Sequence, residues 1–514
     1  MIVHFTSEVA PYYKRGGLGD VAGVLPGYLN EGQSDIVISF FYEGRMQQVD
    51  ILERKGSLHI DIQGVSYEFI YYHHREGNVD FYFLNMSDPL VFSSMEAGNT
   101  GKGSVDGERP YKSDSGLFIY LYFGKAALQL VSQLELSPEF MIFHDWQVCG
   151  CFAFPHLLKG NGSRKNRNTI LLIHNYEYQG DILPDVLPLL DEEVLEELLP
   201  IFEEYGSATL LSVALKNADH VATVSRTYAA ELREGGLPHP GLKFLDMVKK
   251  RIHSLPNGID DRIWSPAYDR SSAGVMKKRA KKALFERLGL TGGVSIGDDR
   301  EPLIVMLCRL TEQKGISLLM DFWNDEERAL RQFGELLDTG IKLVVCGRPS
   351  GGGSGAVNRR FSLAAGRYPG RFSYLPYYDE KTAHELLAAA DMILCPSLFE
   401  PCGLVHLYGM SFGAVPVVRP VGGLRDTVIS YMDSPQQGTG FYIAEFRRES
   451  LIDAVGQAVQ VFRDQPDEWE RIAGRCMEND YSWARQRTNY FRLFDKIRKE
   501  KTPFYEPYGT YNQT

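Results

Sequence analysis

The sequence has no apolar run long enough to span a membrane. Its most apolar helical segment, residues 116–131, is interrupted by Lys125, whereas a spanning helix needs about 20 consecutive apolar residues. The chain enters a strand-like run at Ile2, with no basic segment followed by an apolar one, so we expect no secretory signal. These absences argue against a membrane-spanning or secreted protein, and we expect a cytoplasmic one with no membrane partner.

Cysteine is scarce, and its positions form no metal-binding pattern. The seven cysteines are scattered, several of them in strand-like runs, as is typical of buried thiols in a reducing compartment. Cys149 and Cys151 have neither the spacing of zinc ligands nor a cluster of Cys or His residues around them. We therefore expect no metal site.

Positive charge is in deficit. The chain has 55 basic and 66 acidic residues, a formal charge of -11, whereas proteins that bind polyanions usually carry excess positive charge. Residues 276–289 hold a dense basic run that either binds phosphate or forms a solvated helix face. The solvated face is favoured because no aromatic residues interleave the run, and we expect no nucleic-acid partner.

What is present is enough material for two domains. A chain of 514 residues is too long for one hydrophobic core. Short Val- and Ile-rich runs alternate with helical segments in the first half and again after residue 300, a pattern that predicts two parallel, doubly wound α/β sheets. Three strand-like runs between residues 57 and 85 predict an antiparallel insertion, and the turn-rich residues 255–274 predict a linker.

A glycine-rich turn joins the first strand to the first helix. Gly16 and Gly17 allow close approach of a ligand to the backbone, and the helix that follows offers free N–H groups to an anion. Lys14 and Asp20 add charge at the same place. The turn either binds phosphate or is simply a tight connection, and the sequence leaves both readings open.

Two cations follow a strand in the second half of the chain. Arg309 and Lys314 come directly after the apolar run 303–307, and ligands of open α/β sheets bind at the carboxyl ends of strands. A diphosphate requires both positive charge and directed donors. The alternative is that one cation pairs with Glu312 on the surface, and the position favours the diphosphate.

Polar residues also end two strands of the first half. Asp145 and His174 each follow an apolar run. A single histidine is more often structural than functional. Because the two strands belong to one predicted sheet, however, both residues are expected to face the same cleft.

Glu400 lies between a buried strand and the next helix, and Gly422 and Gly423 occupy a similar junction further on. The glutamate either caps its helix or binds a ligand. The glycine pair offers backbone N–H groups to a phosphate. Two glycine-rich helix starts, an arginine and a lysine around one cleft together indicate a nucleoside diphosphate.

In this order the motifs resemble those of the bacterial glycogen synthase and plant starch synthase family of retaining glucosyltransferases. The segments that carry the resemblance are 7–21, 144–146, 173–180, 255–266, 308–315, 399–404, 422–428 and 481–494. The resemblance implies the GT-B architecture, in which two Rossmann-like domains face each other across a deep cleft. It implies an acceptor-side domain of residues 1–262, a nucleotide-sugar domain of residues 263–484, and a final helix, 485–514, that returns to the first domain.

The resemblance also implies a reaction. Glucose is transferred from ADP-glucose or UDP-glucose to the non-reducing end of an α-1,4-glucan with retention of configuration, without a metal or other cofactor. The sugar nucleotide and the glucan are then the partners, and the oligomeric state stays open. Domain closure is expected, because the donor-site residues come from both domains.

The family motifs assign roles to residues of this sequence. The resemblance places Arg309 and Lys314 on the diphosphate, His174 near the anomeric carbon and Glu400 on the glucose hydroxyls. Asp145 matches an acceptor-side residue, and Tyr378 matches a position beside the nucleotide base. The remaining donor-site residues that the motifs imply are Lys14, Gly16, Gly17, Asp20, Cys402, Gly403, Leu404, Gly422 and Gly423.

The sequence departs from the family pattern at three positions and in the glycine-rich loop that follows residues 346–348. Arg15 stands where Thr or Ser is common, Leu398 where Arg is usual, and His406 where Gln is common. These departures bear on the donor nucleotide and on closure rather than on the reaction class. The alternatives are a GT-B enzyme with another acceptor and a non-catalytic glucan-binding protein on the same fold.

Overall fold

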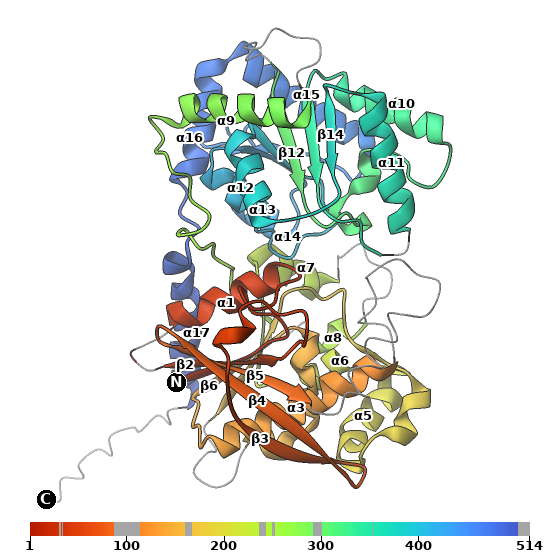
Figure 1. The fold of residues 1–514 in the computed structure, drawn as a ribbon, viewed down its shortest axis with the longest axis vertical. Helices are drawn as coiled ribbons and strands as arrows, with labels where there is room; N and C mark the ends of the chain where they lie inside the picture. The colour runs from red at the N-terminus through yellow and green to blue at the C-terminus, as the bar shows by residue number, and fades with distance from the viewer. Residues whose placement is uncertain are drawn as a thin grey trace, which may run out of the picture.

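The chain folds into two lobes, one above the other in Figure 1. The structure, a computed structural model, describes residues 1–29, 32, 34–86, 114–159, 167–235, 243–248, 252–290, 301–351 and 353–501. Each lobe is built on a mainly parallel sheet with helices on both faces. The predicted fold class, two doubly wound α/β domains, is confirmed.

The N-terminal lobe holds a nine-stranded sheet. Most of its strands are continuous Val- and Ile-rich runs because helices cover both faces of the sheet. In spatial order the strands are β11 (Ile252–Ser254), β10 (His220–Thr223), β7 (Asn168–Ile173), β6 (Phe140–His144), β1 (Ile2–Phe5), β2 (Asp35–Phe40), β5 (Val79–Met86), β4 (Val65–Glu76) and β3 (Glu53–Ile62). A separate two-stranded sheet pairs β8 (Asp181–Ile182) with β9 (Ala208–Thr209).

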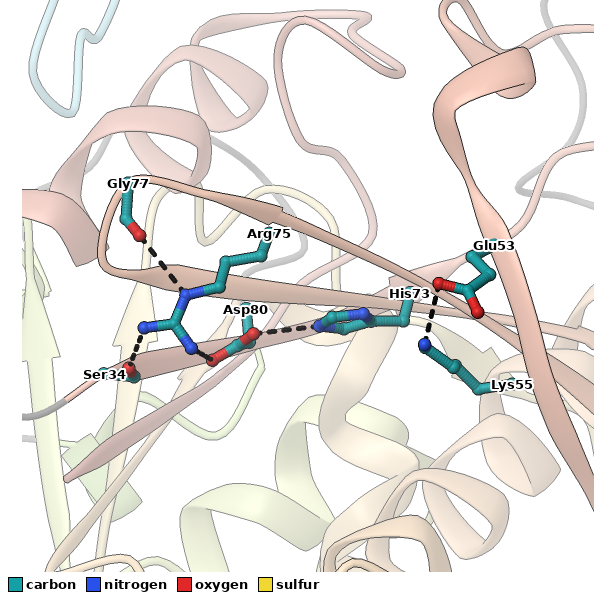
Figure 2. Close-up of polar contacts among 7 residues, drawn as sticks. All are labelled: Ser34, Glu53, Lys55, His73, Arg75, Gly77 and Asp80. Atoms are coloured by element: carbon teal, nitrogen blue, oxygen red, sulfur yellow. Dashed lines mark hydrogen bonds and ion pairs between the residues drawn. The ribbon is translucent and has the colours of Figure 1, made fainter.

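The antiparallel insertion predicted between residues 57 and 85 is confirmed for its first two strands and differs for the third. β3 and β4 pair antiparallel, and so do β4 and β5, but β5 also pairs parallel with β2 and so belongs to the main sheet. On this hairpin Asp80 accepts a hydrogen bond of 2.9 Å from His73 and lies 3.5 Å from Arg75 (Figure 2). Arg75 in turn donates to Ser34 at 2.9 Å, beside the start of β2.

The C-terminal lobe holds a six-stranded sheet in which every neighbouring pair is parallel. Its order is β14 (Phe372–Leu375), β13 (Lys342–Cys346), β12 (Leu303–Leu307), β15 (Met392–Cys395), β16 (Val415–Val418) and β17 (Phe441–Tyr442).

The strand order reverses once in each sheet. In the N-terminal lobe the chain runs outward from β1 in one direction and from β6 in the other, and in the C-terminal lobe the same reversal falls between β12 and β15. Crossover connections leave in opposite directions at such a point, which opens a crevice at the carboxyl ends of the two strands. Both crevices carry residues singled out in the sequence.

Helices cover both faces of each sheet (Figure 1). Those of the N-terminal lobe are α1 (Gly17–Leu29), α3 (Asp114–Gln133), α4 (Pro155–Lys159), α5 (Glu192–Tyr205), α6 (Leu210–Asn217), α7 (Arg226–Glu234) and α8 (Leu245–Val248). Those that follow are α9 (Ala273–Leu288), α10 (Glu326–Leu337), α11 (Ser354–Arg367), α12 (Glu380–Ala389), α13 (Val405–Ser411), α14 (Gly422–Thr427), α15 (Arg448–Asp464), α16 (Pro466–Glu478) and α17 (Trp483–Lys501).

The last helix returns to the first lobe. α17 lies beside α1 in Figure 1, and its Trp483, Tyr490 and Phe494 share a buried cluster with residues of α1 and β6. The two connections between the lobes run side by side, because Ile259 pairs with Ser482 as a β-bridge. This pairing places a candidate hinge at these two segments, while the predicted domain boundary after residue 262 stays a prediction.

Among the described residues, no helix combines the length and the apolar character that crossing a bilayer would require.

Candidate active site

Glu400 and Lys314 meet at the crevice of the C-terminal lobe. Glu400 follows β15 and is only 6% exposed, and its Oε2 lies 2.6 Å from Lys314 Nζ. Ser397 donates a second hydrogen bond of 2.9 Å to the same oxygen. The carboxylate is therefore held in place by a cation and a hydroxyl, both at Oε2.

Arg309 stands at the carboxyl end of β12 with its side chain exposed. No described residue forms an ion pair or hydrogen bond with its side chain, and neither Arg309 nor Lys314 pairs with Glu312. The surface-pair alternative is thus not what the described structure shows. An exposed guanidinium beside a second cation is suited to bind a diphosphate.

Glu8, which follows β1, connects the two lobes electrostatically. Its Oε2 accepts hydrogen bonds from the backbone N–H groups of Arg15 at 2.7 Å and Gly16 at 3.0 Å. Burial raises the pKa of Glu8, while these N–H groups and the charge of Arg309 oppose the rise. Glu8 therefore shapes the glycine turn of one lobe and lies near the arginine of the other.

Asp145 and His174 meet at the crevice of the N-terminal lobe. Asp145 Oδ1 accepts the backbone N–H groups of His174 at 2.8 Å and Asn175 at 3.2 Å. Asp145 has a positive φ of 65°, uncommon for a residue other than glycine. Burial raises the pKa of its carboxyl to about 7, and the two N–H groups lower it only in part.

The raised pKa of Asp145 predicts a pH-dependent stability. The folded protein keeps this proton up to about pH 7, while an unfolded chain releases it near 3.8, so unfolding between these values releases a proton and is favoured as pH rises. We expect the free energy of unfolding to fall, relative to that of Asp145→Asn, by up to about 1.4 kcal/mol per pH unit. Urea unfolding at several pH values measures this difference, and parallel curves for the two proteins would refute it.

The glycine turn at the start of α1 contacts the C-terminal lobe. Lys14 forms an ion pair with Asp20, and its Nζ lies 5.9 Å from the centre of the Tyr378 ring. A Cβ atom on Gly17 would lie 3.2 Å from Leu404 Cδ1. The glycine turn therefore lies beside Tyr378 and Leu404, while the predicted place of Tyr378 beside the nucleotide base stays a prediction.

The second glycine pair lies under the loop of Glu400. The N–H of Gly423 donates to the backbone oxygen of Glu400 at 3.0 Å, and the N–H of Gly422 donates to Glu231 Oε1 of the other lobe at 3.0 Å. A phosphate that used the Gly422 N–H would have to displace Glu231. The predicted phosphate contact of this pair stays a prediction.

A second contact between the lobes joins α14 to α7. Asp426 accepts hydrogen bonds from the backbone N–H of Arg226 at 2.6 Å and from the Thr227 hydroxyl at 2.6 Å. Together with the Glu231–Gly422 bond, this contact forms a latch in which each lobe caps a helix start of the other. The latch holds the lobes together at the rim of the site.

Removing the latch should let the lobes separate. We expect Asp426→Ala to show a larger radius of gyration than the unsubstituted protein in small-angle scattering without nucleotide, and added nucleotide to reduce it. Asp453→Ala, which removes an exposed carboxylate of α15, is the matched control. Identical profiles for all three proteins, with and without nucleotide, would show that the latch does not set the lobe arrangement.

The remaining predicted residues surround Glu400. A Cβ on Gly403, which has a φ of 74°, would lie 3.1 Å from Glu400 Cγ. Burial raises the pKa of Cys402 to about 12, so its thiol stays protonated and is no nucleophile. No group of three or more His, Cys, Asp or Glu side chains in the described part of the chain is placed to hold a metal ion.

Sequence reasoning missed several residues of the site. Glu8 lies inside the segment 7–21 and follows a strand as Glu400 does, so the same argument would have found it. Ser397 precedes Glu400 by three residues and gave no separate signal. Glu231 and Asp426 act between lobes: no local pattern marks Glu231, and Asp426 lies in the segment 422–428 without any local sign of its contact.

Known families and relatives match nearly the whole chain. The family model described as the starch synthase catalytic domain matches residues 1–243, and that of group 1 glycosyl transferases matches residues 295–468. The glycogen synthase of Anaeromyxobacter dehalogenans strain 2CP-C is 34% identical over 510 residues, covering 96% of this chain and 98% of the relative. The chain belongs to the glycogen synthase family. Within that family the glycogen synthase of Lactococcus lactis is 29% identical, with 96% of this chain and 100% of the relative covered.

Solved structures place this family member among the GT-B glycosyltransferases. The catalytic domain of starch synthase IV from Arabidopsis thaliana, bound to ADP and acarbose, matches with a TM-score of 0.81 and 26% identity, covering 96% of this chain and 99% of that one. The sucrose-phosphate synthase of Thermosynechococcus elongatus, with a TM-score of 0.57, 15% identity and 97% and 99% coverage, shares the fold. The chain is therefore a glycosyltransferase with glycogen or starch synthase function.

Proposed function

We propose that this enzyme transfers glucose from ADP-glucose to the non-reducing end of an α-1,4-glucan and retains the anomeric configuration. The observation that carries the proposal is Arg309, exposed and without a hydrogen-bond or ion-pair partner among the described residues, beside the Lys314–Glu400 pair at the switch point of the C-terminal sheet. The ADP in the related starch synthase structure supports the adenine nucleotide. UDP-glucose remains the alternative donor.

The roles follow from charge and position. As the bond between the anomeric carbon and the diphosphate breaks, negative charge grows on the departing nucleotide, and the two cations stabilise that charge. Glu400 already holds Lys314 in place before the donor binds, so little free energy is needed to position the ammonium group. Lys14 approaches from the other lobe, beside Tyr378.

The sugar is held by the acidic residue and the N-terminal lobe. Glu400 has one oxygen occupied by Lys314 and Ser397, and the other accepts hydrogen bonds from glucose hydroxyls. His174, at the end of β7, faces the anomeric carbon, and Asp145 lies on the acceptor side. The reaction needs no metal or other cofactor, since the cations of the chain neutralise the diphosphate.

We propose a glucan as the acceptor because the relatives are named glycogen synthase and starch synthase. A non-catalytic glucan-binding protein is disfavoured because Lys14, His174, Arg309, Lys314 and Glu400 are all present. We further propose that the enzyme acts in the cytoplasm and binds neither membranes nor nucleic acid, in line with its formal charge of -11.

A donor panel tests the proposal. ADP-glucose and UDP-glucose are each supplied with a glucan primer, and release of the nucleoside diphosphate and extension of the primer are followed together. We expect both signals with ADP-glucose and a kcat/KM about tenfold or more lower with UDP-glucose. Diphosphate release without primer extension would exclude a glucan acceptor, and a preference for UDP-glucose would reverse the donor assignment.

A further inference from the structure

Three histidines form a continuous hydrogen-bonded chain that runs from the active site into the N-terminal sheet. They lie on or directly after three adjacent strands: His4 is on β1, His144 on β6 and His174 directly after β7. His4 Nδ1 lies 3.1 Å from His144 Nε2, and His144 Nδ1 lies 3.0 Å from His174 Nε2. The rings also stack in pairs, with centroids 5.4 Å and 5.3 Å apart.

All three rings are neutral at the pH of the cell. Burial lowers the pKa of His4 and of His174 to about 3, and it lowers the pKa of His144 well below its ordinary value. A neutral imidazole has one N–H donor and one acceptor nitrogen. Each of the two hydrogen bonds in the chain therefore needs one ring to donate and the next to accept.

This requirement couples the tautomers of the three rings. If His4 carries its proton on Nδ1, it donates to His144 Nε2, so His144 must carry its own proton on Nδ1 and donate to His174 Nε2. If His4 carries its proton on Nε2, every bond reverses. The three rings are thus all protonated on Nδ1 or all on Nε2, and the buried end of the chain determines what His174 presents to the cleft.

The buried end decides between the two states. His4 Nε2 is buried and has no hydrogen-bond partner among the described residues. A proton on His4 Nε2 would leave a buried N–H donor without an acceptor, and such donors are rare in native structures. The proton then lies on Nδ1 of His4, and the chain carries this choice to His174.

We propose that His4 and His144 are positioning residues that fix His174 as its Nδ1–H tautomer, which makes His174 a hydrogen-bond donor to the sugar. The inference rests on the proposed function only in naming the sugar as the group that His174 faces. His174 Nδ1 forms no hydrogen bond with the described residues, and the side chain is partly exposed. A sugar oxygen that accepts from this N–H would be selected, and a group that can only donate would be rejected.

Nitrogen-15 NMR reads the tautomers directly. In protein labelled on its 12 histidines, ring proton–nitrogen spectra distinguish a protonated from an unprotonated ring nitrogen, and His4→Gln, His144→Gln and His174→Gln assign the three rings. We expect all three to be neutral and protonated on Nδ1 between about pH 5 and pH 8. A proton on Nε2 of any of them, or a charged ring, would overturn the proposal whatever the donor or acceptor proves to be.

Kinetics separate positioning from packing. In His144→Asn the amide takes the place of Nδ1 and can still donate to His174, whereas the ring of His144→Phe cannot. We expect kcat/KM to fall about tenfold or more in His144→Phe and to recover at least in part in His144→Asn. His253 lies on β11 of the same sheet and is not one of the three hydrogen-bonded histidines. The kcat/KM of His253→Phe should therefore stay within about twofold of that of the unsubstituted enzyme.

Equal losses in the two His144 variants would show a packing role and overturn the inference. If His144→Phe fails to fold, as its thermal unfolding would reveal, the nitrogen spectra of the unsubstituted enzyme alone decide. Loss of activity in Arg309 or Lys314 variants bears on the proposed function and leaves these spectra unchanged.

Discussion

Replacing Arg309 or Lys314 with alanine is expected to lower kcat/KM for glucosyl transfer about tenfold or more, which corresponds to about 1.4 kcal/mol of lost transition-state stabilisation. Each side chain supplies a positive charge where the departing diphosphate gains negative charge. Lys314→Ala should have the larger effect, because it also leaves the buried Glu400 without its cation at 2.6 Å. Steady-state kinetics with a glucan primer measure both losses.

The matched control is Arg328→Ala, which removes an exposed arginine of α10 in the same lobe. It should leave kcat/KM within about twofold of the unsubstituted enzyme. If both site variants behaved as this control does, the two cations would have no part in the departure of the nucleotide, and the proposed diphosphate site would be wrong.

Substituting Gly423 with alanine should also have a large effect, by a different route. A Cβ atom there would lie 2.1 Å from the backbone oxygen of Cys402 and 2.6 Å from its carbonyl carbon, so the backbone itself must shift. Gly423 also donates to the backbone oxygen of Glu400 at 3.0 Å, so the loop that carries this carboxylate moves with it. Because a displacement of about 1 Å can cost about a hundredfold in rate, we expect a loss of that order.

A second glycine supplies the control for this prediction. Gly456 lies inside α15, and a Cβ there would meet nothing within 4 Å. Gly456→Ala should therefore keep its activity and gain about 0.5–1 kcal/mol of stability, since alanine favours the helix. Unfolding curves and kcat/KM of both variants are the measurements, and full activity in Gly423→Ala would contradict the packing described for this loop.

Local patterns in the sequence predicted the architecture and indicated candidate site residues at the carboxyl ends of strands. Apolar runs such as residues 303–307 form buried strands because parallel sheets are covered on both faces. Residues that follow such strands, among them Arg309, Glu400 and Asp145, lie at the carboxyl ends of the strands of their own sheets, where ligands of open α/β sheets bind. The spatial order of the strands could not be predicted from the sequence. The pairing of β5 with both β2 and β4 was therefore missed.

The contacts between the lobes could not be predicted from local patterns in the sequence. Asp426 and Thr227 are 199 positions apart, and Glu231 and Gly422 are 191 apart. Their bonds exist because of how the two lobes sit on each other, which depends on the whole surface of each and on the paired connections at Ile259 and Ser482. The chain of three histidines was missed for a similar reason. In the sequence each of them is a single, isolated histidine, and only the order of β1, β6 and β7 in the sheet brings them together.

A crystal structure with ADP-glucose or ADP bound tests the central claim most directly. The account predicts that the Arg309 guanidinium and the Lys314 ammonium each lie within hydrogen-bonding distance, about 3 Å, of the diphosphate oxygens. It also predicts Lys14 of the opposite lobe beside the same nucleotide. A bound nucleotide whose phosphates lie away from Arg309 and Lys314 would contradict it.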